Sequence, residues 1–384
     1  MSSRINLRQV RRTPLDGAIA LLFLALPIGV WASYDPGFSL KRALFVVLGI
    51  AAFYALSSFI TCQKRLAWAL GFFFAMGSIV AFMGLVGTRW LYKFALASAL
   101  LRQFPQWIRG LPGAAEGFHP NEIAGVLLWF VPLQIAVLGY QLTTRRLRGA
   151  GGWALAASTL LNLTTLLLTQ SRSGLLGLAV GTLVLGLCVS RRLRLALVLP
   201  ALAGGLVLAT RGGWWFETFW GGPGLRPVMG ELNLQFRMEV WKAAVWGIRD
   251  FPFTGMGLGM FRYVARALYP LSIEPTYDIA HAHNGFLQAG VDLGLVGLFA
   301  YVAVWLSATA SLARSLLRSE AWYRAVASGL AGCLFGYLVY NLTDTVALTA
   351  KPAPAWWMLL GFIVSVEWLV DGRRRAQVTD GGVL

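Results

Sequence analysis

Two of the three histidines of this 384-residue chain, His281 and His283, lie where a long polar segment ends and an apolar run begins. Histidine exchanges a proton readily near neutral pH, so it can serve as a general acid or base. If the apolar run is a membrane helix, His283 lies at the helix N-terminus, at the membrane–water boundary. We therefore expect His283 to be catalytic. The alternative is an interfacial histidine that only anchors the helix end.

Three arginines are candidates for binding an anion. Arg172 lies at the expected N-terminus of a membrane helix, where a cation opposes the helix dipole unless an anion sits between them. The free N–H groups of a helix N-terminus and a guanidinium together form a phosphate site. Arg237 begins an amphipathic helix expected at 236–248, and Arg211 lies earlier in the same polar segment. For each arginine the alternative is an ordinary contact with lipid head groups.

The residues after His283 suggest close helix packing. Asn284 follows directly, and Gly294 lies eleven residues after His283, which is about three turns of a continuous helix and hence the same face. Together with Gly290, Gly294 and Gly297 form a stripe of small residues that would let another helix approach closely.

The composition predicts an all-α polytopic integral membrane protein. The chain is 57% hydrophobic and 13% charged, whereas about a quarter of a soluble domain is charged. We expect a single membrane domain over 1–384. The three cysteines are scattered, which argues against a disulfide framework or a metal cluster. The polar loops offer no carboxylate cluster with metal-ligand spacing, so neither a metal nor a cofactor is expected.

Ten apolar runs have about the length that a bilayer core requires. They are 14–33, 40–60, 66–87, 121–141, 152–169, 173–190, 194–210, 284–308, 323–344 and 354–371. The segment 90–108 contains Lys93, Arg102 and Pro105, and we expect it to be an interfacial helix. Counting further spans there would bring the total to between ten and twelve.

The basic residues between the runs predict a topology. Their clusters fall on one side of the membrane if both termini are cytoplasmic. The loop 211–283 then lies on the outer, periplasmic side, although it is rich in arginine. An anionic ligand at the outer face explains this excess most simply. Within the loop, the expected helix at 236–248 would lie in the membrane interface.

Four motifs, in this order, resemble the bacterial O-antigen ligase and O-antigen polymerase superfamily. They are Pro120-Asn121-Glu122-Ile123-Ala124-Gly125, then Gln170-Ser171-Arg172-Ser173-Gly174, then Arg237 with Trp241 followed by Phe251-Pro252 and a glycine turn, and finally His283-Asn284 with Gly294 and Gly297. Members of this superfamily are lipid-linked glycan transferases.

The resemblance implies an inner-membrane glycosyltransferase of lipopolysaccharide biosynthesis. The donor would be a glycan on undecaprenyl diphosphate, and an O-antigen ligase would transfer it to a sugar hydroxyl of lipid A-core. The resemblance makes His283 the residue that activates or positions the acceptor hydroxyl, and it assigns the donor diphosphate to Arg172, Arg237 and Arg211. It implies no metal, cofactor or nucleic acid, and it places the active site on the periplasmic face.

Three alternatives stay open. An O-antigen or exopolysaccharide polymerase of the same superfamily would use a lipid-linked glycan as acceptor, and the sequence does not separate it from a ligase. A polysaccharide or lipid transporter ranks lower, because the charges cluster at helix ends and no internal repeat is evident. A cell-wall glycan polymerase would be expected to use an acid of the outer loop, where Glu231, Glu239, Glu274 and Asp278 occur.

Overall fold

A computed structural model describes residues 11–90, 101–104, 106–110, 115–145, 149–189, 210, 234–271, 279–346 and 348–380. The described helices are α1 (Asp16–Trp31), α2 (Pro36–Phe59), α3 (Gln63–Gly87), α5 (Pro120–Leu127), α6 (Val131–Thr143), α7 (Ala150–Leu168), α8 (Arg172–Val189), α10 (Leu234–Asp250), α11 (Phe261–Leu268), α12 (Gly285–Arg318), α13 (Ala321–Asn341) and α14 (Ala353–Asp380). Local signals set several boundaries: Asp35 caps α2 by accepting the Phe38 N–H at 2.9 Å, directly before Pro36.

The helices confirm the all-α polytopic membrane class. Seven of them are long and apolar enough to cross a membrane, by length and composition: α2, α3, α5 together with α6, α7, α8, α12 and the first part of α14. Nine of the ten expected spans coincide with described helices. The remaining expected span, 194–210, lies outside the described residues except for its last residue. Most of the expected interfacial helix at 90–108 also lies outside them.

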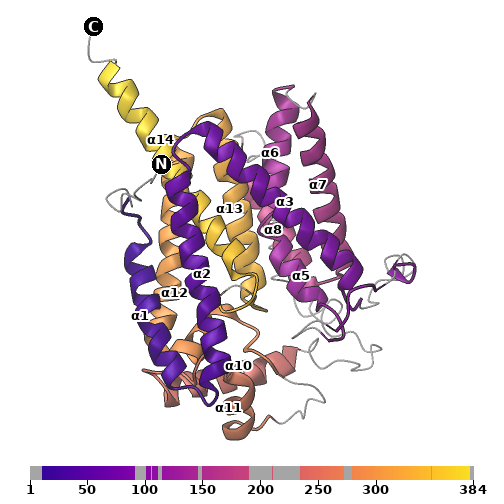
Figure 1. Ribbon diagram of the computed structural model, residues 1–384, viewed down its shortest axis with the longest axis vertical. Helices are drawn as coiled ribbons and strands as arrows, with labels where there is room; N and C mark the ends of the chain where they lie inside the picture. Colours follow the sequence, from indigo (N-terminus) through magenta and orange to yellow (C-terminus); the bar gives the residue numbers. More distant parts are fainter. Residues whose placement is uncertain are drawn as a thin grey trace, which may run out of the picture.

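The helices run alternately between two ends of the molecule (Figure 1). One end, which we call the basic end, carries the α2–α3, α6–α7 and α12–α13 connections. The described cations in and beside these connections are Lys64, Arg65, Arg145, Arg318 and Arg324. The opposite end, which we call the loop end, carries α10 and α11, and α12 starts there. The basic segments therefore share one end, as the charge pattern predicted.

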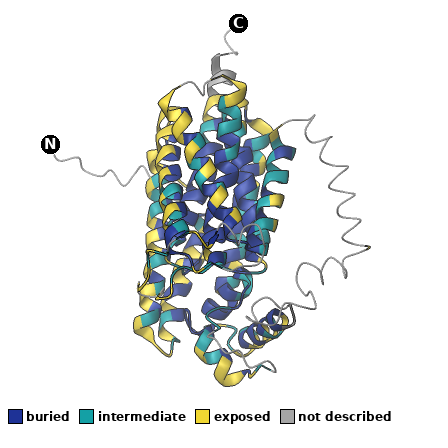
Figure 2. Ribbon diagram, turned by 90° about the vertical axis from the view of Figure 1, so that its right-hand side faces the viewer, coloured by how far each residue is buried: buried dark blue, intermediate teal, exposed yellow. Residues whose placement is uncertain are grey.

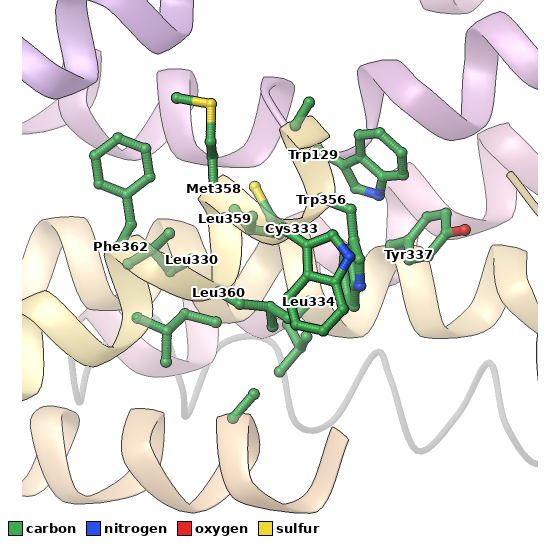
Figure 3. Close-up of a cluster of buried hydrophobic side chains, with 14 of the residues drawn as sticks. Trp129, Leu330, Cys333, Leu334, Tyr337, Trp356, Met358, Leu359, Leu360 and Phe362 are labelled. Atoms are coloured by element: carbon green, nitrogen blue, oxygen red, sulfur yellow. The ribbon is translucent and has the colours of Figure 1, made fainter. Parts of the chain in front are cut away.

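The central helices are α14 and the α5–α6 span. In their apolar 18-residue stretches, 83% and 78% of the residues are buried inside the protein, against 33% for α8. Figure 2 shows the buried positions along the middle of the bundle and the exposed ones on its flanks. Figure 3 shows the core, in which Trp129 meets Tyr337 of α13 and Trp356 of α14, with ring centroids 5.2 and 6.1 Å away. The α5–α6 span breaks just before Pro132, which cannot donate the helical hydrogen bond to Leu128.

Glycines bring α8 and α13 into backbone contact. A Cβ added at Gly177 would lie 2.6 Å from the Gly336 carbonyl oxygen, and one added at Gly181 would lie 2.5 Å from that of Gly332. Small residues allow such close helix packing in membranes. Since the two helices are antiparallel, this packing places the start of α8 beside the end of α13, at the loop end.

The expected continuous helix after His283 is interrupted at Gly294, so the prediction of one uninterrupted helical face is wrong. Gly294 has φ 66° and ψ −166°, and α12 bends there. A glycine turn of the loop packs against α12 at this break. The Leu295 N–H donates to the Pro252 carbonyl at 2.7 Å, and the Met256 N–H donates to the Val291 carbonyl at 2.6 Å. Gly294 is therefore needed for its backbone conformation, and it does not belong to a helix-packing stripe.

We expect Gly294→Ala to destabilise the protein. Its φ and ψ lie in a region open essentially to glycine alone, which costs other residues about 1–3 kcal/mol. The added Cβ would also lie 2.6 Å from the Pro252 carbonyl oxygen. Thermal unfolding of the detergent-solubilised protein measures the effect. Gly139→Ala in α6 is the matched control, because no atom lies within 4 Å of its Cβ position; equal melting temperatures for the two variants would contradict the assignment.

The helix expected in the membrane interface, at 236–248, is α10, but its apolar face packs on protein. Phe236, Val240 and Ala244 are buried in a cluster with Val291 of α12 and Met256 of the glycine turn. Only the other side of α10 is exposed. The amphipathic pattern predicted the helix correctly, and the buried face of α10 packs on α12 and the glycine turn. The location of α10 in the membrane interface stays a prediction.

Candidate functional site

The turn 342–346, which follows α13 at the loop end, brings the candidate residues together. It holds Thr343 and the buried Asp344, whose side chain is 6% exposed. The carboxylate of Asp344 is held from two sides: the Asn121 amide of α5 donates to its Oδ2 at 3.1 Å, and the N–H of the next residue, Thr345, donates to its Oδ1 at 2.9 Å. The turn therefore contacts α5, α8, α10 and the start of α12.

His283 faces this carboxylate. Its Nδ1 lies 3.5 Å from Oδ1 of Asp344, and the side chain is 8% exposed. A histidine with Nδ1–H toward a carboxylate keeps its lone pair on Nε2, which is the arrangement of a general base oriented by an acid. None of the described residues bonds this Nε2. His283 also has a φ of 48°, a left-handed conformation that is uncommon outside glycine and often marks a functional site.

His281 is the second histidine on Asp344, with its Nε2 3.8 Å from the same Oδ1. Its Nδ1 accepts the backbone N–H of His283 at 3.3 Å. The neutral ring therefore carries its proton on Nε2, directed at the carboxylate. The two rings pack with centroids 4.4 Å apart. His281 therefore supports the backbone of His283.

The charge of Asp344 is stabilised by its surroundings. Burial by itself raises the pKa of Asp344, but the neighbouring His283 and His281, together with Arg237, outweigh burial and hold the pKa well below its ordinary value. Asp344 is therefore a carboxylate throughout the neutral range. A permanent negative charge at Nδ1 stabilises the imidazolium that forms when Nε2 takes up a proton.

The donor atoms of His281, His283 and Asp344 lie within 4.8 Å of one another, so the three residues could in principle surround a metal ion. The hydrogen bond at His281 argues against this role. Because its Nδ1 already accepts the His283 N–H, a metal on Nε2 would require removal of the remaining proton. The contacts of Asp344 with the two imidazoles favour ion pairing over metal binding, and the absence of a metal requirement stays a prediction that a chelator tests.

Arg237 lies on α10 and reaches the same turn. Its guanidinium donates to the Thr343 carbonyl, and the residue is 4% exposed. It also lies close enough to Asp344 to lower the pKa of that carboxyl. The sequence predicted an arginine at the start of an amphipathic helix. The structure adds that this arginine is enclosed next to the His283–Asp344 pair.

Arg172 is the first residue of α8, as the sequence predicted. Ser171 caps the helix by accepting the Gly174 N–H at 3.2 Å. The next residue, Ser173, accepts a hydrogen bond from the Thr343 hydroxyl at 2.9 Å. Thr343 therefore joins the start of α8 to the Arg237 guanidinium. The two predicted anion-binding arginines belong to two separate helices, α8 and α10, and the turn 342–346 contacts both helices.

A chain of buried polar contacts holds the backbone around His283. Asn284 caps α12 by accepting the N–H groups of Phe286 and Leu287 at 2.9 and 3.1 Å. The amide of Gln288 accepts the Ala282 N–H at 2.7 Å and donates to Asp292 at 2.8 Å. Asp292 in turn accepts the Gly259 N–H at 2.9 Å. The intramembrane acid Asp292 thus has a structural role, fastening the glycine turn and the His283 segment to α12.

Sequence reasoning missed the importance of Asp344. Nothing local to 341–346 in the sequence resembles an active site. An acid just past a predicted membrane helix on the same side as the catalytic histidine is the signal that could have found it. Arg211, the third arginine predicted to bind the donor, lies outside the described residues.

Comparison with known proteins indicates a family for part of the chain. Residues 157–302 match the family model described as O-antigen ligase, and this segment contains Arg172, Arg237 and His283. No curated protein matched the chain. A chain of a solved structure reported as "Structural coordination of polymerization and crosslinking by a peptidoglycan synthase complex" is similar at 17% identity, over 92% of this chain and 97% of that one, with a TM-score of 0.46. The family match supports membership of the O-antigen ligase and polymerase superfamily.

Proposed function

We propose, on the premise of that family match, that the protein transfers a glycan from undecaprenyl diphosphate to a sugar hydroxyl, as an O-antigen ligase with lipid A-core as acceptor. The observation that carries the proposal is the pairing of His283 with Asp344, with Arg237 and the start of α8 on the same turn. Transfer of a sugar from a diphosphate requires a base for the acceptor and cationic groups for the leaving diphosphate, side by side.

In the proposed step, Nε2 of His283 takes the proton of the acceptor hydroxyl. The hydroxyl oxygen forms a bond to the anomeric carbon of the donor sugar, and the bond from this carbon to the diphosphate oxygen breaks. The bonding electrons leave with undecaprenyl diphosphate, and the proton on His283 then passes to the diphosphate or to water. Asp344 does not change its protonation; it orients the ring and stabilises the imidazolium.

The leaving group is stabilised by arginine. The diphosphate gains negative charge as the bond breaks, and guanidinium groups bind phosphate oxygens in pairs. Arg172 adds its own charge to the positive end of the α8 helix dipole. We assign Arg172 and Arg237 to the diphosphate and keep Arg211 as a third candidate. Because cationic side chains can provide this stabilisation, the step needs no metal ion.

We place the active site on the periplasmic face of the bacterial inner membrane. The basic end carries the Lys- and Arg-rich connections, and such connections face the cytoplasm in most inner-membrane proteins. With the basic end inside, the loop end and the His283 turn face outward, and both termini are cytoplasmic. Labelling of single cysteines introduced at Tyr34 and Arg145 with a membrane-impermeant reagent tests this orientation, and labelling of the Arg145 position alone would reverse it.

We expect Arg172→Ala to weaken donor binding about ten- to a hundredfold, which corresponds to the loss of ~1.5–3 kcal/mol for a charged hydrogen bond. Binding of a lipid diphosphate to purified protein measures the effect. Arg172→Lys should restore part of the affinity, since it keeps the charge without the paired donors. Arg249→Ala, an exposed arginine of α10, is the matched control. Unchanged affinity in folded Arg172→Ala would remove Arg172 from the diphosphate site.

Ligase and polymerase differ in the acceptor, so a reconstituted assay separates them. Purified protein in proteoliposomes is given a lipid-linked single-repeat donor with and without lipid A-core. Transfer that requires lipid A-core supports the ligase. Chain extension on the lipid-linked donor itself identifies the polymerase, and movement of the intact donor across the membrane without transfer identifies a transporter.

A further inference from the structure

A groove on the flank of the bundle, far from the His283 turn, has features of a lipid site. It has a volume of about 600 Å³ and lies between α3, α6 and α7, with Trp322 at the start of α13 closing one side. Most of its wall is apolar, including Ala67, Ala75 and Ala154. We propose that this groove binds an acyl chain of an anionic phospholipid whose head group lies at the basic end.

The groove begins at the basic end and has the depth of one membrane leaflet. Its lining on α3 runs from Ala67, near the start of the helix, to Ile79. Twelve residues of helix extend ~18 Å, which is slightly more than half of a hydrocarbon core of ~30 Å. At its mouth the lining residues are Gln141, near the end of α6, and Gly151, near the start of α7. A single acyl chain that enters from this leaflet fits the groove along its length.

Polar atoms without a partner lie at the mouth. Oε1 of Gln141 and Nε1 of Trp322 are buried and have no hydrogen-bond partner among the described residues. Leaving such atoms unsatisfied is unfavourable. One is an acceptor and the other a donor, so a head-group hydroxyl of a phospholipid can donate to Gln141 and an ester carbonyl can accept from Trp322. The ester groups of a lipid lie just below the phosphate, and the hydroxyls belong to the head group above them.

Deeper in the groove the lining hydroxyl groups, those of Ser78 and Ser158, already have partners. Ser78 of α3 and Ser158 of α7 share a hydrogen bond of 2.7 Å, and the Gln134 amide donates to Ser158 at 2.7 Å. Asn162 extends this network by donating to Gln134 at 3.0 Å. The inner part of the groove therefore needs no polar group from a ligand, and it suits a hydrocarbon chain.

The charge around the mouth favours an anionic head group. Lys64, Arg65, Arg145 and Arg324 are exposed and lie within four residues of lining positions. Within the same reach, Glu320 is the one acid among the described residues. Each cation close to the membrane surface strengthens binding to anionic lipid about fivefold, the equivalent of ~1 kcal/mol. Charge complementarity thus selects an anionic lipid over a zwitterionic one.

Native mass spectrometry of the full-length protein in detergent tests this proposal. The probes are phosphatidylglycerol and phosphatidylcholine with identical acyl chains. We expect one phosphatidylglycerol to be retained at least about tenfold more strongly than phosphatidylcholine. Arg145→Gln should reduce this preference about fivefold, whereas Arg249→Gln at the loop end should leave it unchanged. Equal retention of the two lipids would overturn the proposal.

Filling the groove distinguishes lipid bound in the groove from lipid that adheres to the protein surface in general. Ala154→Trp places an indole in the groove, and Ala157→Trp places one on an exposed position of α7 that does not line it. Only Ala154→Trp should lose the retained phosphatidylglycerol, with glycan transfer preserved in both variants. Loss in both variants, or in neither, contradicts the site. Displacement of phosphatidylglycerol by undecaprenyl phosphate would show that the groove holds the polyprenyl chain, and this too would overturn the proposal.

Discussion

His283→Ala is expected to reduce glycan transfer about 10²–10⁴-fold, the range in which a general base contributes to catalysis. The loss follows from the proposed role of His283 as the base, since its Nδ1 faces Asp344 at 3.5 Å and its Nε2 is directed away from that contact. Transfer is measured with purified protein in proteoliposomes, as the rate at which labelled glycan moves from the lipid-linked donor to the acceptor. Donor binding should be nearly unchanged, since the arginines that we assign to the diphosphate are intact.

The backbone at His283 calls for a second variant. Its φ of 48° is left-handed, and alanine tolerates this conformation poorly. Asparagine tolerates it better and cannot act as a base, so His283→Asn should fold like the parent protein and be as inactive as His283→Ala. His281→Ala is the neighbouring comparison and should retain more activity. Substantial transfer by correctly folded His283→Asn would exclude general-base catalysis by this residue.

Asp344→Asn is expected to lower the rate constant of transfer by about 10²–10⁴-fold while the KM for the donor changes little. Asparagine keeps the size of the side chain but removes the charge that stabilises the imidazolium. Its amide can also donate to His283, which would reverse the hydrogen bond and place the ring proton on Nε2. The base would then be blocked although every residue of the site is in place. Steady-state kinetics with varied donor and saturating acceptor separate the two constants.

Two controls distinguish this role from a merely structural one. Asp371→Asn removes an acid from an ion pair with Arg318 at the basic end and should leave transfer unchanged. Asp344→Glu keeps the charge and should recover part of the rate. If Asp344→Asn raised the donor KM with an unchanged rate constant, Asp344 would serve substrate binding or the shape of the turn. A parallel loss of thermal stability would identify a folding defect.

The sequence by itself determined the membrane class and most helix positions. Apolar runs of bilayer length are a local property, so nine expected spans reappear as described helices. The sequence also determined which residues begin helices: Arg172 starts α8, and Asn284 caps α12 directly after His283. Capping and hydrophobic periodicity depend on neighbours a few residues away, and these neighbours are visible in the chain.

Only the tertiary structure decided what those helix ends face. Asp344 pairs with His283 because α12 and α13 pack together, and Thr343 meets Ser173 because glycines let α8 and α13 touch. The covering of α10 by α12 and the break at Gly294 also depend on contacts between distant segments. Helix packing in a membrane is set by shape complementarity and by the need to satisfy buried polar groups. No local pattern encodes those contacts, so the sequence pointed to His283, Arg172 and Arg237 as candidates, and only the fold brought Asp344 to His283.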